Sequence, residues 1–192
     1  KDHDGDFFAT EENGVLRGSH WRGVDCNDAL DDVYPGRKST EHPHSVDHNC
    51  NGIAGGDAKG SYEAQYCEGT GQRGLIMLGD SATAHFHIPP QWMTAQGWNL
   101  NGFKEDALDE LDFPHCSWGT GHASLEECPY QDSVADPNAG ILSLYTQLRD
   151  RNRCNHNDFQ NIGVNGARMT SSMGLVEAMA RGPELDQPVL VW

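Results

Sequence analysis

Hydrophobic and polar positions are distributed differently in the two parts of this chain, and the change falls at residue 74. Residues 1–73 are rich in Gly, Asp, Asn and His and show almost no periodic apolar pattern. Such a segment buries too little apolar surface to order itself unless disulfides or a metal hold it. From residue 74 onward, short apolar runs alternate with helical patterns. We therefore expect a loop-rich region over 1–73 and an α/β domain over 74–192.

Three apolar runs in the second region predict strands. Residues 74–79 form a short buried run, residues 159–164 a second one, and residues 188–192 begin a third. Helical patterns lie between them, and strands that alternate with helices imply a parallel sheet joined by right-handed crossovers. The predicted fold class is therefore α/β with a parallel sheet.

Apolar residues at helical spacing predict helices over 103–111, 139–152 and 170–181. A turn or helix is also expected near Ser81, and residues 112–138 are expected to form a loop. The helix over 139–152 would place Ile141, Leu142, Leu144, Tyr145 and Leu148 on one face. The helix over 170–181 would turn Met173, Val176 and Met179 with Ala180 inward, and Gly182-Pro183 would stop it.

The net charge of −16 argues against nucleic-acid binding, because a phosphate backbone would be repelled. Bound divalent cations would offset part of that charge. The apolar runs are far too short to span a bilayer. The chain does not open on the basic and apolar segments of a secretory signal, so such a signal is absent or already removed.

The chain has six cysteines and no Cys-x-x-Cys pair, which argues against a zinc ribbon. Scattered cysteines in even number among Gly- and Asn-rich loops favour disulfides and an oxidising compartment. Six cysteines allow fifteen pairings, so the sequence leaves the connectivity open. Locality and motif context favour the pairs Cys26–Cys50, Cys67–Cys154 and Cys116–Cys128.

The run over residues 74–79 is followed by Asp80 and Ser81, which places a serine at the carboxyl end of a predicted strand. Ligands and catalytic groups of open α/β sheets lie at this edge. A nucleophilic serine needs a base and backbone donors for the oxyanion, and the amides of Ser81 and Gly166 could supply the donors. The same serine would equally serve as a helix N-cap. The three-residue motif leaves both roles open.

The sequence offers no convincing base for this serine. His85 and His87 follow closely, and on a continuing helix His85 would lie near Ser81. Asp112-Phe113-Pro114-His115 has the spacing of a relay pair, but we interpret it as coincidental because it lies in a loop beside a cysteine. His156 is a further candidate without supporting context.

Three acidic or Asn-rich clusters in residues 1–73 predict calcium sites. Calcium takes six to eight hard oxygen ligands, and glycine permits the tight turns that bring them together. The third cluster begins as an Asp-x-Asn-x-Asn-Gly loop, but Ala58 stands where an EF-hand has its bidentate Glu, so ligands from separate loops are expected instead. The alternative is a solvated polar loop. The candidate ligands are Asp2, Asp4 and Asp6; Asp25, Asn27 and Asp28; Asp47, Asn49 and Asn51; and the carbonyl groups of Phe8, Leu30 and Ile53.

Many stretches of the chain together resemble the acyloxyacyl hydrolases, esterases of the GDSL (SGNH) class that remove secondary fatty acyl chains from the lipid A of lipopolysaccharide. The most specific stretch is Leu78-Gly79-Asp80-Ser81-Ala82 with Ala84-His85-Phe86-His87-Ile88. Others are Asp4-Gly5-Asp6, Leu16-Arg17-Gly18, Trp21-Arg22-Gly23, Asp25-Cys26-Asn27-Asp28, Val33-Tyr34-Pro35-Gly36-Arg37, Asn49-Cys50-Asn51-Gly52-Ile53, Cys67-Glu68-Gly69, Arg151-Asn152, Cys154-Asn155-His156, Gln160-Asn161-Ile162 and Asn165-Gly166-Ala167.

The resemblance implies the central part of a large catalytic subunit with a flavodoxin-like, three-layer α/β/α hydrolase fold, truncated here. It implies that Ser81 is the nucleophile, that Gly166 is the oxyanion glycine of the second block, and that the front region binds calcium. The family also has a saposin-like domain upstream, a Gly-x-Asn-Asp block and a late Asp-x-x-His that supplies the base. The chain ends at Trp192, where the Gly-x-Asn-Asp block would be about to begin.

We therefore expect an esterase of acyl-ester lipids, lipopolysaccharide or phospholipid, in a secreted or lysosomal (vesicular) setting. Because the His/Asp block is missing, the 192-residue chain alone is expected to have little activity. The competing hypothesis is a calcium-stabilised binding module without catalysis.

Overall fold

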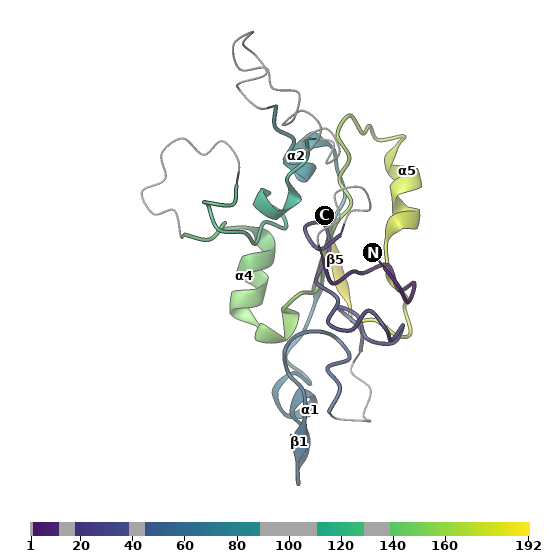
Figure 1. The fold of residues 1–192 in the computed structure, drawn as a ribbon, viewed down its shortest axis with the longest axis vertical. Helices are drawn as coiled ribbons and strands as arrows, with labels where there is room; N and C mark the ends of the chain where they lie inside the picture. Colours follow the sequence, from purple (N-terminus) through teal and green to yellow (C-terminus); the bar gives the residue numbers. More distant parts are fainter. Residues whose placement is uncertain (1, 12–17, 39–44, 89–110, 129–138) are drawn as a thin grey trace.

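The computed structural model describes residues 2–11, 18–38, 45–88, 111–128 and 139–192, and the statements below concern these (Figure 1). A three-stranded sheet lies at the centre, formed by β3 (Gly74–Met77), β4 (Phe159–Asn161) and β5 (Val189–Val191). The strand order is β4-β3-β5, and both pairings are parallel. The prediction of three strands in a parallel sheet is confirmed.

The central strand β3 is buried along its whole length, as expected for a strand with neighbours on both sides and cover on both faces. On one face, Leu75 and Met77 pack with Tyr145 and Phe159, whose ring centroids are 4.4 Å apart. Tyr145 belongs to α4 (Leu144–Arg151), and this helix therefore covers that face of the sheet.

Helix α4 begins at Leu144, five residues later than the pattern predicts. Ser143 is its N-cap and forms a capping box with Thr146, which fixes the start of the helix. Leu142 precedes the cap and is 79% exposed, so its predicted place on the buried face is wrong.

The helix predicted over 170–181 is much shorter and does not turn its apolar residues inward. It consists of α5 (Ser172–Leu175) and the 3-10 helix η4 (Val176–Ala178). Met173 is 80% exposed and Val176 is 51% exposed, because one α-turn followed by a 3-10 turn does not continue a single helical face. In Figure 1, α4 and α5 lie on opposite sides of the sheet. Opposite sides are expected because the right-handed crossovers from β3 to β4 and from β4 to β5 run in opposite directions across the sheet.

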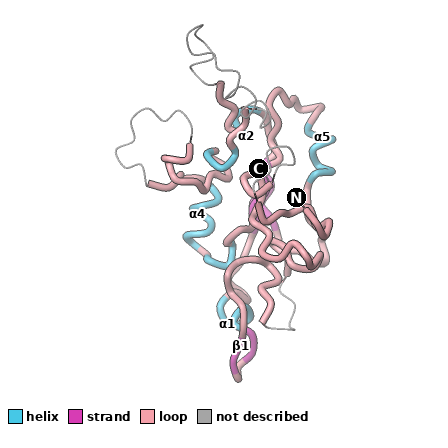
Figure 2. Tube along the Cα trace, viewed as in Figure 1, coloured by secondary structure: helices cyan, strands magenta, loops and turns pink. Residues whose placement is uncertain are grey.

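The front region contains little regular structure, as Figure 2 shows. Its elements are a two-stranded hairpin, β1 (Gly56–Asp57) and β2 (Gly60–Ser61), and helix α1 (Tyr62–Tyr66). Residues 21–23 lie along β4: Gly23 N–H donates to the Phe159 carbonyl at 3.0 Å, and Asn161 N–H donates to the Trp21 carbonyl at 2.7 Å. The front region therefore lies against the outer edge of the sheet.

Three disulfides form, and they are the pairs that locality favours. Cys26–Cys50 closes a loop within the front region, and Cys67–Cys154 joins the end of α1 to the 3-10 helix η3 (Arg153–Asn155) just before β4. Cys116–Cys128 closes the loop that follows the 3-10 helix η2 (Pro114–Cys116).

Two sequence predictions fall largely outside the described residues: the helix over 103–111, and the last part of the loop over 112–138. Among the helices that the structure describes, none has the length and apolarity needed to cross a membrane.

Candidate functional site

Ser81 lies at the carboxyl end of the central strand, as the first residue of α2 (Ser81–Ala84). The turn before it needs Gly79, because a Cβ at that position would collide with the Thr83 side chain. Asp80 is the N-cap of this helix, and its carboxylate accepts a hydrogen bond from Ala82 N–H at 3.0 Å. The capping role considered for Ser81 is therefore wrong, and the Ser81 hydroxyl is left available for chemistry.

The loop that carries Gly166 leaves β4 at the same edge of the sheet. Val164 N–H donates to the Gly79 carbonyl at 3.1 Å, which joins this loop directly to the turn before Ser81. Gly166 is exposed, with a φ of 77°, and a Cβ added there would meet no atom within 4 Å. The loop is therefore close to the serine, and its glycine leaves the backbone open to a ligand.

The candidate histidines of the sequence analysis differ in backbone setting and burial. Helix α2 ends at Ala84, and His85 is its C-cap with a φ of 57°, so the expectation that a continuing helix stacks His85 near Ser81 is wrong. Burial lowers the pKa of His85 and also that of His156.

His115 lies in the interior. Its ring lies against that of His20 of the front region, tilted by 31° with centroids 3.8 Å apart, and Asp112, three residues earlier, is also buried. Burial first, and then the charges of His20, His122 and His85, lower the pKa of His115 to about 3. A histidine with so low a pKa is a weak general base, and this one is enclosed in the core.

Five aspartates of the front region gather into one acidic cluster. The carboxylates of Asp2, Asp4 and Asp6 lie within 4.8 Å of one another, and so do those of Asp4, Asp25 and Asp28. Asp4 belongs to both groups, so the first two predicted clusters meet at one place. The Asn27 backbone N–H donates to Asp25 at 2.8 Å, which keeps Asn27 beside them.

The acidic cluster fits a hard cation. Oδ2 atoms of Asp4, Asp6 and Asp25 are buried and have no hydrogen-bond partner among the described residues. Burial first, and then the charges of Asp4, Asp25 and Asp2, raise the pKa of Asp6 to about 7. Burial also raises the pKa of Asp25. Carboxylates that disfavour their own charge in this way are stabilised by a cation, and all-oxygen ligands suit calcium or magnesium.

The third predicted cluster is joined to the second by the Cys26–Cys50 disulfide, and it includes a residue that the sequence did not predict. Asp47 accepts hydrogen bonds from the N–H groups of Asn51 and Gly52, which closes the loop. The amides of Asn49 and Asn51 donate to Glu63 at 2.8 and 3.0 Å. Glu63 is a buried residue of α1, and burial raises its pKa. No local spacing relates Glu63 to this loop, so only the folded chain brings it there.

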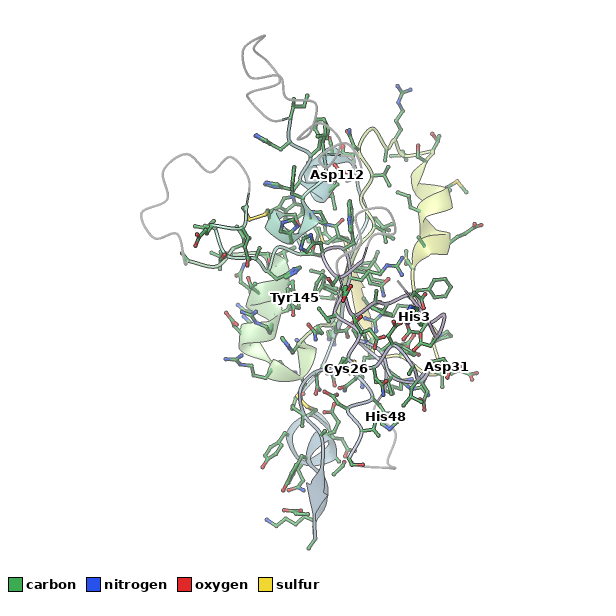
Figure 3. The ribbon with its side chains drawn as sticks, in the orientation of Figure 1. His3, Cys26, Asp31, His48, Asp112 and Tyr145 are labelled. Atoms are coloured by element: carbon green, nitrogen blue, oxygen red, sulfur yellow. A yellow bond between two sulfur atoms is a disulfide. The ribbon has the colours of Figure 1, made fainter. Side chains whose placement is uncertain are left out.

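The three carbonyl residues of the prediction lie close to these clusters in sequence. Phe8 is buried, and its N–H donates to Asp6 at 2.8 Å. Leu30 is 42% exposed, and Ile53 N–H donates to Asn51 at 2.8 Å. Figure 3 shows His3, Cys26, Asp31 and His48 together in the front region, while Asp112 lies near α2 at the other end of the molecule. The acidic cluster and Ser81 are thus separate sites.

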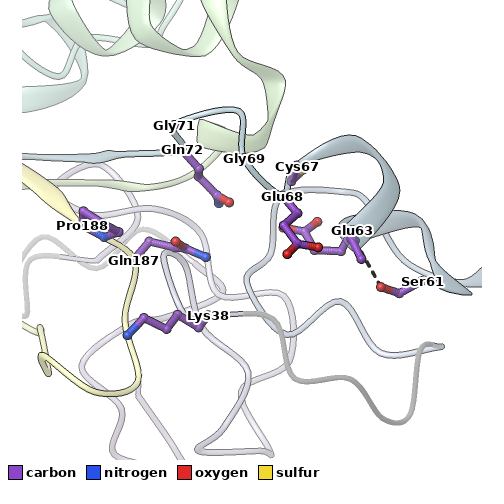
Figure 4. A pocket seen from close by; sticks show the side chains of 11 residues that line it. Lys38, Ser61, Glu63, Cys67, Glu68, Gly69, Gly71, Gln72, Gln187 and Pro188 are labelled. Carbon is purple, nitrogen blue, oxygen red and sulfur yellow. Dashed lines mark hydrogen bonds between the residues drawn. The ribbon is translucent and has the colours of Figure 1, made fainter.

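A cavity of about 510 Å³ lies between the front region and the start of β5 (Figure 4). Its lining includes Lys38, Glu63, Glu68, Gln72 and Gln187. Gly74 N–H donates to the Pro188 carbonyl at 2.9 Å, so this cavity is at the amino end of the sheet. Ser81 is at the carboxyl end, so the cavity does not serve it.

A mixed α/β fold with a parallel sheet and a Gly-Asp-Ser turn after its central strand fits the SGNH-like class. Comparison with known proteins confirms the resemblance found in the motifs. The chain is 44% identical over 196 residues to acyloxyacyl hydrolase of Oryctolagus cuniculus, 43% identical over 198 residues to that of Homo sapiens, and 45% identical over 184 residues to that of Mus musculus. These alignments cover 100%, 100% and 92% of the chain.

The chain spans about a third of the length of these relatives, 32%, 32% and 30%. No protein-family model matches it. Identity at this level along the chain shows that it is homologous to part of acyloxyacyl hydrolase, and the relatives are hydrolases by name. Its three disulfides fit a protein of an oxidising compartment.

Proposed function

We propose that the chain is part of a serine esterase that hydrolyses fatty acyl esters of lipids. The observation that carries the proposal is the position of Ser81 at the carboxyl end of the central strand, with Asp80 rather than Ser81 capping the helix. The identity of 43–45% to acyloxyacyl hydrolases supports it.

In the proposed reaction, the Ser81 hydroxyl oxygen attacks the ester carbonyl while a histidine takes its proton. The amide N–H groups of Ser81 and Gly166 donate to the oxyanion of the tetrahedral intermediate. The intermediate collapses to an acyl-enzyme, and the leaving alcohol receives the proton from the histidine. Water then attacks the acyl-enzyme with the same histidine as base, and the fatty acid is released.

We propose that the base comes from a part of the protein outside these 192 residues, because the resemblance implies that a late Asp-x-x-His supplies it and because burial lowers the pKa of His115, the histidine of the Asp112–His115 pair, to about 3. The longer protein would also carry the Gly-x-Asn-Asp block and the saposin-like lipid-binding domain that the resemblance implies. The isolated 192-residue chain is accordingly expected to hydrolyse acyl esters weakly or not at all.

The substrate class that we propose is an acyl-ester lipid, with lipopolysaccharide first because of the relatives and phospholipid as the second candidate. Secretion or delivery to a lysosomal or vesicular compartment is in keeping with the disulfides.

A serine-directed fluorophosphonate probe tests the nucleophile in the full-length protein. Labelling is expected in the wild type and in a Ser61→Ala control, since Ser61 caps the distant helix α1, and is expected to vanish in Ser81→Ala. Hydrolysis of an acyl ester should be lost with the label. Wild-type protein that binds lipid but never reacts with the probe would favour a calcium-stabilised binding module without catalysis.

We also propose that the front region binds calcium through the acidic cluster and the Asp47–Glu63 loop. A cation that binds only the folded state stabilises it, by about 2.7 kcal/mol at a concentration of 100 times Kd. Chelation should therefore lower the Tm of the full-length protein. Asp25→Asn, at a carboxylate that is 1% exposed, should reduce that shift, whereas Asp31→Asn at an exposed position should not. Equal Tm values with calcium and with chelator would contradict the proposal.

A further inference from the structure

One buried side chain, that of Asn161, contacts both segments that form the proposed oxyanion site. Asn161 is the last residue of β4 and is 1% exposed. Its amide nitrogen donates to the Thr83 carbonyl at 2.8 Å, and its amide oxygen accepts from Gly163 N–H at 3.0 Å. Thr83 is in α2, two residues after Ser81, and Gly163 lies three residues before Gly166.

The two segments are packed closely where Asn161 joins them. A Cβ added to Gly163 would lie 3.0 Å from the Ala84 nitrogen and 3.1 Å from the Thr83 Cβ. The Val164 N–H donates to the Gly79 carbonyl at 3.1 Å on the other side of the same contact. The start of the Gly166 loop is thus fixed against the nucleophile turn by one side-chain amide and one backbone hydrogen bond.

The orientation of the amide is determined by its partners. The Thr83 carbonyl needs a donor and Gly163 N–H needs an acceptor, so the nitrogen must face α2 and the oxygen must face the loop. The same nitrogen also donates to Thr120 Oγ1 at 3.0 Å, and that hydroxyl donates to the Pro114 carbonyl at 3.3 Å. Thr120 is fully buried in the loop closed by Cys116–Cys128. This loop therefore holds the Asn161 amide nitrogen through a further hydrogen bond.

We propose that Asn161 is a positioning residue that sets the spacing between the two amide donors, those of Ser81 and Gly166. It acts through the two segments and does not itself touch the substrate. The proposal rests on the proposed esterase function and adds to it. Because oxyanion donors act only at the correct distance, a small change in this spacing lowers kcat and leaves substrate binding almost unchanged.

Asn161→Asp in the full-length protein tests this. The substitution preserves size and the acceptor for Gly163, but it removes the donor and places a carboxylate oxygen against the Thr83 carbonyl. The expected result is a fall in kcat of about 10-fold to 100-fold, with KM changed by less than about 2-fold, and an equally slower reaction with the fluorophosphonate probe. Asn161→Ser, which is too short to reach both segments, should give the same split if the carboxylate variant does not fold.

The neighbouring residue Gln160 provides a matched control. It is also fully buried in β4, and its amide makes the same kind of paired contact, donating to the Ala180 carbonyl and accepting from Ala180 N–H, both at 3.0 Å. Gln160→Glu should cost comparable free energy of unfolding in urea but leave kcat within about 2-fold of the wild type.

The outcomes separate the two proposals. If the wild type never reacts with the probe, the esterase function fails and this inference fails with it. If the wild type reacts and both Asn161 variants keep its kcat, the esterase function stands and the positioning role is wrong. An equal loss of kcat in Gln160→Glu would also overturn the positioning role, since it would reflect a general loosening of the core.

Discussion

Gly166 and Gly71 share one backbone conformation, with φ values of 77° and 76°, and a Cβ at either would meet no atom within 4 Å. Replacing either by alanine should therefore cost about 1 kcal/mol of unfolding free energy, from the left-handed backbone alone. Only Gly166 lies in the loop proposed to donate to the oxyanion. Gly166→Ala should lower kcat/KM for an acyl ester by at least about 10-fold, and Gly71→Ala should leave it unchanged.

Urea unfolding and steady-state kinetics on the two full-length variants make this comparison. Equal activities of Gly166→Ala and Gly71→Ala would show that the Gly166 amide takes no part in the reaction.

The roles of some individual residues could be predicted from the sequence, and those of others could not. Asp80 and Ser81 are both good N-cap residues, so the sequence could not say which of them caps α2, and the backbone decided in favour of Asp80. The candidate ligands Asp2, Asp4 and Asp6 could be found because they alternate in one short loop. Glu63 could not, because it approaches Asn49 and Asn51 only after α1 folds back on their loop.

Among the elements, α4 has the strongest cap. Ser143 is fully buried, its hydroxyl accepts from Thr146 N–H at 3.0 Å, and it donates to the Gly121 carbonyl at 2.7 Å. Ser143→Ala removes the cap and also leaves a buried carbonyl without its donor, so we expect a loss of about 2–3 kcal/mol of unfolding free energy. Ser61 caps α1 at the surface with one bond of 3.1 Å, so Ser61→Ala should cost only about 1 kcal/mol.

Urea denaturation of the two alanine variants measures the difference. Similar losses for both serines would mean that the Gly121 contact contributes little.

The strands could be predicted because each is a short apolar run, and the parallel order followed from the helical patterns between them. The helices were harder to place. The start of α4 depends on a capping box two residues beyond Ile141, and the apolar residues of 170–181 line no buried face. The spacing of apolar residues indicates where one face of a helix could form. Whether a helix forms there depends on its cap and on the elements that pack against it.

Across the whole molecule, a histidine cluster joins three parts of the chain. His20 comes from the front region, His85 from the end of α2, His115 from η2, and His122 from the loop closed by Cys116–Cys128. Burial first, and then the other three histidines, lower the pKa of His115 to about 3. The unfolded chain takes up this proton near the ordinary pKa of 6.5, so the stability due to neutral His115 is fully present above pH 6.5 and is lost as the pH falls toward 3.

The wild type should lose roughly 2 kcal/mol from this group between pH 6.5 and pH 5. His115→Gln, which cannot be protonated, should remove that part of the pH dependence of unfolding in urea. An identical decline with pH in wild type and variant would contradict the assignment.

The sequence could not predict how the front region packs against the sheet. Its composition showed that disulfides or a metal must order it, and locality favoured the disulfide pairs. The alignment of residues 21–23 along β4 depends on backbone hydrogen bonds to Phe159 and Asn161, which leave no side-chain pattern.

The strand order has a consequence for how the protein is made. In the central strand, Leu75 pairs with Phe159, 84 residues later, and Ile76 pairs with Val191, 115 residues later. A ribosome adds about 5–20 residues per second, so this apolar strand waits roughly 6–23 s for its second partner. Pairing between strands so far apart in sequence slows folding and leaves an apolar, aggregation-prone segment exposed on the nascent chain. The strand that delivers Ser81 is thus among the first parts of the sheet to be synthesised and the last to be enclosed, and its biogenesis should depend on chaperones.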